Sequence, residues 1–118
     1  MEENLVESKS KKFAVRIVKL YQYLDREKRE YVMSKQILRS GTSIGANVRE
    51  ALQGQSKADF TAKMSIALKE VNETEYWLEL LRDADYLSED EYESIQRDCG
   101  EVARLLTSIV RTSRRERT

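Results

Sequence analysis

Residues 39–51 read RSGTSIGANVREA, and six of the seven residues from Ser40 to Ala46 are small. Large side chains hold neighbouring helices about 8–10 Å apart, so a run of small residues lets another backbone come closer. Gly41 and Gly45 lie four apart and share one helix face, although each costs about 1 kcal/mol of helix propensity relative to alanine. We expect a neighbouring helix to pack closely here, with assembly as the first interpretation. A local kink without special packing is the alternative.

The composition around this segment is that of a helical protein. The chain has 118 residues, no proline and 4 glycines, with 36% charged and 40% hydrophobic side chains. Residues that break regular structure are therefore few, and good helix formers dominate. The length suits one domain with one core. We predict a single all-α domain over residues 1–118.

Apolar residues recur at helical spacing in four segments. Gly54 marks the end of the second segment, and Ser56 with Asp59 and Ser88 with Glu91 resemble capping boxes that start the third and fourth. The charged run DREKREY suits a solvated corner between the first two segments. Because the connections are short, we predict an antiparallel up-down four-helix bundle. The predicted helices span residues 4–25, 33–53, 56–86 and 88–112, and a frayed tail follows over 113–118.

The predicted third helix carries more apolar surface than one bundle core requires. Its main stripe is accompanied by a second one, which includes Ile66, Trp77, Leu80 and Ala84. Excess apolar surface of this kind is typical of an interface. The charges also favour association, since residues 1–55 have a basic excess and residues 56–110 an acidic one, within a neutral total of 21 basic and 21 acidic side chains. The two halves could attract each other within one bundle or between neighbouring subunits, and we predict self-association. For any single charge, an ordinary solvated helix face is the alternative.

Polar residues in the opening segment form a ridge. Arg39, Ser43 and Asn47 are spaced by fours along one side of the second helix, and Glu50 follows. If buried, these groups would need partners and would fix the helix register, whereas if exposed they would form a binding ridge. Both alternatives stay open. The predicted set for assembly or partner recognition is Arg39, Gly41, Ser43, Gly45, Asn47, Glu50 and Trp77.

Two basic clusters are candidate nucleic-acid contacts. In an antiparallel four-helix bundle both chain ends lie together, so their charges would combine, and a ring would multiply them. A solubilising tail is the alternative, and without aromatic stacking residues sequence-specific binding has no support. The candidates are Lys9, Lys11 and Lys12 near the start and Arg111, Arg114, Arg115 and Arg117 near the end.

The residue types needed for most catalysis are missing. Histidine is absent, and the chain has no glycine-rich phosphate loop and only one cysteine, Cys99, which falls on an apolar stripe and is interpreted as a core thiol. Four carboxylates of the third helix could bind a hard cation such as magnesium, but helix-surface carboxylates paired with Lys or Arg are far commoner. These four are Glu70, Glu73, Glu75 and Glu79. We predict no enzymatic activity, no cofactor, and no catalytic or metal-binding residue.

No apolar run approaches the length of a membrane span, and the acidic N-terminal residues do not resemble a secretory signal. A cytoplasmic protein without membrane contact is therefore expected.

Several residues together resemble one known family. They are Gln36, Ile37, Arg39, Ser43, Ile44, Asn47, Glu50, Ser56, Phe60, Glu73, Glu75, Tyr86, Leu87, Ser88 and Glu91. Their pattern is similar to the four-helix-bundle family named for proteins encoded in 23S ribosomal RNA intervening sequences. Many relatives have proline in place of Gly45 and glycine in place of Ala51.

The resemblance implies a bacterial bundle that assembles as a ring-shaped homopentamer and has no established catalytic activity. It also implies kinship with the accessory protein of diversity-generating retroelements, a basic pentamer that binds nucleic acid and a reverse transcriptase, whereas this chain is neutral. The first functional hypothesis is a non-enzymatic, self-associating scaffold for protein interactions. The alternative is an RNA-binding or other nucleic-acid-binding accessory protein that acts with a ribonucleoprotein or reverse transcriptase.

Overall fold

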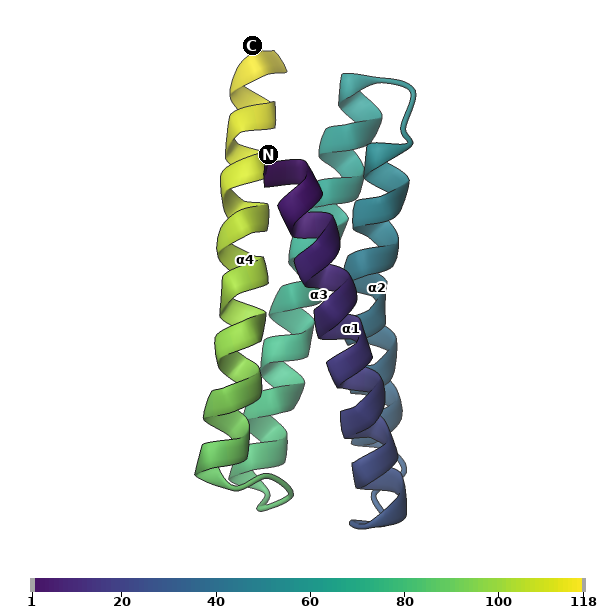
Figure 1. Ribbon diagram of the computed structural model, residues 1–118, viewed down its shortest axis with the longest axis vertical. Helices are drawn as coiled ribbons and strands as arrows, with labels where there is room; N and C mark the ends of the chain where they lie inside the picture. The colour runs from purple at the N-terminus through teal and green to yellow at the C-terminus, as the bar shows by residue number, and fades with distance from the viewer. Residues whose placement is uncertain (1, 118) are drawn as a thin grey trace.

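The computed structural model describes residues 2–117, which form four α-helices joined by short connections. The prediction of an all-α protein with four helices is confirmed. The molecule measures 47 × 21 × 19 Å, and Figure 1 shows the chain passing along its long axis once in each helix, with both termini at the same end. The helices are α1 (Glu2–Arg26), α2 (Met33–Leu52), α3 (Lys57–Asp83) and α4 (Glu89–Arg117).

Apolar side chains from all four helices form one core. The stripes expected from the spacing point inward, and the residues between them face solvent. Cys99 is fully buried, and burial raises the pKa of its thiol to about 12, which matches its interpretation as a core residue. None of the described helices is both long and apolar enough to cross a membrane. Core residues include Phe13, Ile17, Leu24, Ile37, Ile44, Val48, Met64, Val71, Leu78, Leu81, Val102 and Leu106.

The capping signals mark the starts of α3 and α4. The Asp59 backbone N–H donates to Ser56 Oγ at 3.0 Å. At α4 the box is reciprocal, because the Glu91 N–H donates to Ser88 Oγ at 3.1 Å and the Ser88 N–H donates to Glu91 Oε1 at 2.8 Å. Helix α3 ends earlier than expected, since Asp85 adopts a left-handed conformation with φ 68°.

The corner between α1 and α2 differs from the expected solvated loop. Glu30, one residue of the charged run, is only 7% exposed. Its carboxylate accepts hydrogen bonds from the backbone N–H groups of Val32, Met33 and Ser34, at 3.1, 3.0 and 2.7 Å. Glu30 therefore satisfies the donors at the start of α2, where the sequence has no conventional N-cap side chain.

The predicted frayed tail is wrong, because α4 continues as a helix to Arg117; Thr118 lies outside the described residues. Polar contacts with the start of α3 hold this last part. Ser113 is buried and shares a hydrogen bond with the Thr61 hydroxyl. Lys57 Nζ lies 2.6 Å from Glu116 Oε1. These contacts replace the apolar residues whose absence suggested fraying.

Candidate interaction surfaces

The two glycines of the opening segment face α1 of the same chain. A Cβ atom added at Gly41 would lie 2.7 Å from Ile17 Cγ1, and one added at Gly45 would lie 3.4 Å from the Ser10 carbonyl oxygen. The close approach expected from the small residues therefore occurs between α1 and α2. This intramolecular contact accounts for Gly41, which is buried, so its assignment to an assembly surface is corrected. At the partly exposed Gly45 an added Cβ would meet Ser10 at an ordinary contact distance, and its role in assembly stays a prediction.

The polar ridge of α2 lies half-exposed. Ser43 Oγ donates to the Arg39 carbonyl oxygen at 2.6 Å, and Asn47 Nδ2 donates to the Ser43 carbonyl oxygen at 2.8 Å. Both side chains thus bond within their own helix, while the Arg39 side chain extends to α3. Glu50, at the far end of the ridge, pairs with Lys63 of α3 at 3.1 Å. The ridge runs along the junction between the two helices.

We call this junction the α2–α3 seam; it comprises Arg39, Ser43 and Asn47 of α2 and Ile66, Glu70, Glu73 and Trp77 of α3. Arg39 Nη1 lies 3.3 Å from Glu70 Oε2, and Arg39 Nη2 lies 2.5 Å from Glu73 Oε2. Trp77 Nε1 donates to Glu73 Oε2 at 3.1 Å. The hydrogen bond from Arg39, followed by that from Trp77, lowers the pKa of Glu73. The seam is an electrostatic network that joins α2 to α3.

Apolar side chains of α3 remain exposed beside this network. Ile66 is 41% exposed and Tyr76 is 55% exposed. The Tyr76 ring packs edge-on against the half-buried Trp77 ring, with centroids 5.3 Å apart. Sequence reasoning identified Ile66 and Trp77 but missed Tyr76, whose position directly before Trp77 was the available signal. The seam therefore combines ion-paired groups with an aromatic surface.

Protonation of Glu73 is expected to change the fluorescence of Trp77, the one tryptophan of the chain. Above the lowered pKa, Glu73 is ionised and accepts the indole N–H; as pH falls through that pKa, the bond and its stabilisation are lost. Because the pair is partly exposed, its contribution to the free energy of unfolding is about 1 kcal/mol or less. A pH titration of the emission should show a transition below the ordinary range of a glutamate.

Two variants control this titration. Glu73→Gln should remove the transition, while Glu79→Gln, which changes an exposed carboxylate of the same helix, should leave it in place. Equal titration curves for the wild type and Glu73→Gln would contradict the assignment.

The lysines of α1 are interleaved with other charges. Lys9 Nζ lies 3.2 Å from Glu101 Oε1, and Lys9 and Lys12 line a small cavity together with Glu101 and Asp98. Lys11 faces a different groove, between α1 and α2. The structure therefore divides the three lysines between two sites that contain carboxylates, instead of gathering them into one basic cluster.

Three of the predicted basic residues at the chain end do come together. Arg111, Arg114 and Arg115 line a groove of about 350 Å³ between α3 and α4, whose apolar part includes Leu68 and Val110. Arg114 Nη2 also donates to Ser65 Oγ at 3.4 Å. We call this the arginine groove. The Arg117 side chain lies outside the described residues.

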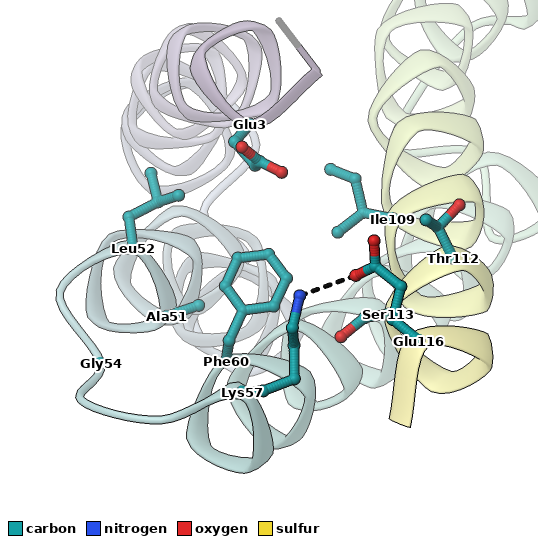
Figure 2. A pocket seen from close by; sticks show the side chains of 10 residues that line it. All are labelled: Glu3, Ala51, Leu52, Gly54, Lys57, Phe60, Ile109, Thr112, Ser113 and Glu116. Atoms are coloured by element: carbon teal, nitrogen blue, oxygen red, sulfur yellow. Dashed lines mark hydrogen bonds and ion pairs between the residues drawn. The ribbon is translucent and has the colours of Figure 1, made fainter. Parts of the chain in front are cut away.

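A further cavity, of about 390 Å³, lies at the end of the bundle beside the last turns of α4. Figure 2 shows Phe60 inside it, with Leu52 and Ile109 on opposite sides and the Lys57–Glu116 ion pair beside the ring. Its polar groups are carboxylates, hydroxyls and one paired lysine, which do not form a nucleophile–base pair.

Three of the four carboxylates considered for metal binding have other partners. Glu70 and Glu73 contact Arg39, and Glu75 Oε2 accepts a hydrogen bond from Gln96 Nε2 at 3.0 Å. Among the described residues, no three Asp, Glu, Cys or His side chains are gathered as a metal site. Their arrangement is that of ordinary interhelical pairs.

Known proteins share both the sequence pattern and the fold of this chain. A family model described as 23S rRNA-intervening sequence protein matches residues 2–108. A crystal structure of a protein of unknown function from the S23 ribosomal protein family of Bacteroides thetaiotaomicron VPI-5482 is 61% identical in sequence, with a TM-score of 0.93. The match covers 94% of this chain and 99% of that one. A search of curated proteins found no match.

Proposed function

We propose a function for this chain, which belongs to the 23S rRNA-intervening sequence protein family. It is a non-enzymatic bundle that self-associates and acts as a scaffold for protein interactions. The observation that carries this proposal is the set of large apolar side chains that remain exposed around a complete core. These are Leu5, Val15, Val18, Tyr31, Val32, Ile66 and Tyr76.

The exposed side chains favour association for an energetic reason. Fully burying a side chain of this size contributes about 1.5–3 kcal/mol, and the single bundle obtains only part of it from side chains that are 38% to 71% exposed. At the seam, Trp77 donates to Glu73, whose charge is paired with that of Arg39, and the exposed Tyr76 ring packs against Trp77. An apolar centre with a polar, ion-paired surround is typical of protein interfaces. We assign the seam to recognition of a partner protein.

Native mass spectrometry and light scattering at micromolar concentration test self-association. We expect a mass that is a multiple of the 13.8 kDa chain, with a ring of five copies as the family resemblance implies. A stable monomer across this concentration range would overturn the proposal.

The arginine groove favours a second candidate function, RNA or other nucleic-acid binding in support of a ribonucleoprotein or reverse transcriptase. Guanidinium groups bind phosphates well, and here three of them surround an apolar surface.

Exchanging Arg111 and Arg114 for glutamine should weaken binding of structured RNA. The slope of log affinity against log salt concentration is negative, and its magnitude should decrease by about 0.7–0.9 for each phosphate that the protein ceases to neutralise. Arg49→Gln, on α2, is the matched control, and absence of RNA binding at low salt would end this alternative.

A further inference from the structure

The corner between α1 and α2 presents two apolar side chains to solvent. Tyr31 is 51% exposed and Val32 is 71% exposed. Val32 occupies the N-cap position of α2, where Ser, Thr, Asp or Asn is preferred because the side chain can accept a backbone hydrogen bond. Glu30 fulfils that role instead. Neither capping nor the core explains why the corner is apolar.

An apolar groove opens at the same end of the molecule. Figure 1 shows α1 and α4 diverging toward the end that holds the α1–α2 and α3–α4 connections, and these two helices have the least extensive contact of the neighbouring pairs. The groove between them has a volume of about 530 Å³. Its apolar residues are Leu20, Tyr23, Leu87 and Ile95.

The walls of this groove carry opposite charges. Arg16 and Lys19 lie on the α1 side, and Asp90 and Glu91 on the α4 side. Arg16 is held in place, because its Nη1 lies 2.7 Å from Asp98 Oδ2 and its Nη2 donates to Ser94 Oγ at 2.6 Å. This bridge ties α1 to α4 beside the opening, so the groove is a pre-formed feature of the bundle.

The charges around the apolar corner complement the α4 wall. Three basic residues, Arg26, Lys28 and Arg29, and one acidic residue, Glu27, are exposed on the corner, whereas the first turn of α4 contains Glu89, Asp90 and Glu91. The basic excess of the first half of the chain and the acidic excess of the second half are thus both represented at one end of the bundle. Complementary patches of this kind orient an encounter between two molecules.

We propose that the α1–α4 groove binds the Tyr31–Val32 corner of a second copy of this chain. This inference rests on the proposed self-association and specifies its contact. Tyr31 and Val32 act as anchors in a pocket, surrounded by basic residues of one copy and acidic residues of the next. Since each copy presents both a corner and a groove, the contact is heterologous, and such a contact forms a ring when the rotation between copies closes.

Substitutions at the corner separate assembly from folding. Val32→Ser places a preferred N-cap residue at the start of α2, so the free energy of unfolding of the dissociated chain should stay equal or rise. Val32→Ser and Tyr31→Ser each remove a side chain that the proposed contact would bury. Each should therefore raise the dissociation constant of the assembly by about 10-fold to 100-fold. Tyr76→Ser is the comparison variant, because Tyr76 is a similarly exposed tyrosine beside the seam, and it should lose assembly instead if the seam mediates self-association.

Mixing two variants tests the heterologous geometry. Tyr31→Ser with Val32→Ser removes the corner, and Asp90→Arg reverses the charge of the groove wall. Each variant should assemble more weakly alone than the wild type does, whereas their mixture should form 1:1 complexes through the one intact corner and the one intact groove.

Sedimentation or native mass spectrometry distinguishes the outcomes. If the wild type assembles, and the corner variants assemble equally well while Tyr76→Ser does not, this contact is overturned and self-association stands. A monomeric wild type overturns both.

Discussion

Replacing Glu30 by alanine is expected to lower the free energy of unfolding by about 2–4 kcal/mol, because three backbone N–H groups at the start of α2 lose their acceptor. The carboxylate is almost fully buried and receives the N–H groups of Val32, Met33 and Ser34 within 3.1 Å. Water replaces these bonds only in part when the site is buried. Urea denaturation followed by circular dichroism would measure the change.

Two neighbouring substitutions make this result specific. Glu30→Gln keeps one acceptor oxygen and should cost less than alanine. Glu27→Ala, at an exposed position of the same corner, should change the stability by less than about 0.5 kcal/mol. If the Glu30 and Glu27 substitutions had equal effects, the capping role of Glu30 would be refuted.

Gly41→Ala is expected to lower the free energy of unfolding by about 1–2 kcal/mol, although alanine favours a helix over glycine by about 1 kcal/mol. The new Cβ would lie 2.7 and 2.8 Å from Ile17 Cγ1 and Cγ2. Ile17 is fully buried, and its two branches lie too near its own backbone to move freely. Either α1 must shift away from α2 or the core must rearrange. Thermal and chemical unfolding would measure the loss.

Gly100→Ala, the same substitution in α4, is expected to raise the free energy of unfolding. Its new Cβ would meet only the flexible end of Arg104, at 3.4 Å, so the gain in helix propensity should stabilise α4 by about 0.5–1 kcal/mol. Combining Gly41→Ala with Ile17→Ala should cost less than the sum of the two single changes. Stabilisation by Gly41→Ala would show that α1 and α2 are not in tight contact at this point.

Periodicity and capping residues were sufficient to predict an all-α protein of four helices and most of its core. Ile17, Leu78 and Leu106 are buried as their spacing indicated. Ser88 and Glu91 form the capping box that their separation suggested. These features depend on residues within about one helical turn of each other, so the order of residues along the chain contains them.

Contacts between distant residues could not be predicted in this way. Nothing near Arg39 in the chain indicates that Glu70 and Glu73 are its partners. Likewise, nothing in the polar end of α4 indicates that the Ser113 hydroxyl will be buried in a hydrogen bond with the Thr61 hydroxyl. These pairs depend on how far each helix slides and rotates against its neighbour. Sequence spacing alone does not determine those two quantities.

Residues 39–51 combine a local property, the small size of their side chains, with a packing partner that depends on the whole fold. The sequence by itself determined that Gly41 lies on an unusually small helix face, where another backbone could come close. The tertiary structure decided that the neighbour is Ile17 of the same chain, and that apolar side chains stay exposed on α1, at the Tyr31–Val32 corner and beside the seam. The reason is that side-chain size acts locally, whereas the identity of the neighbour depends on packing all four helices around one core.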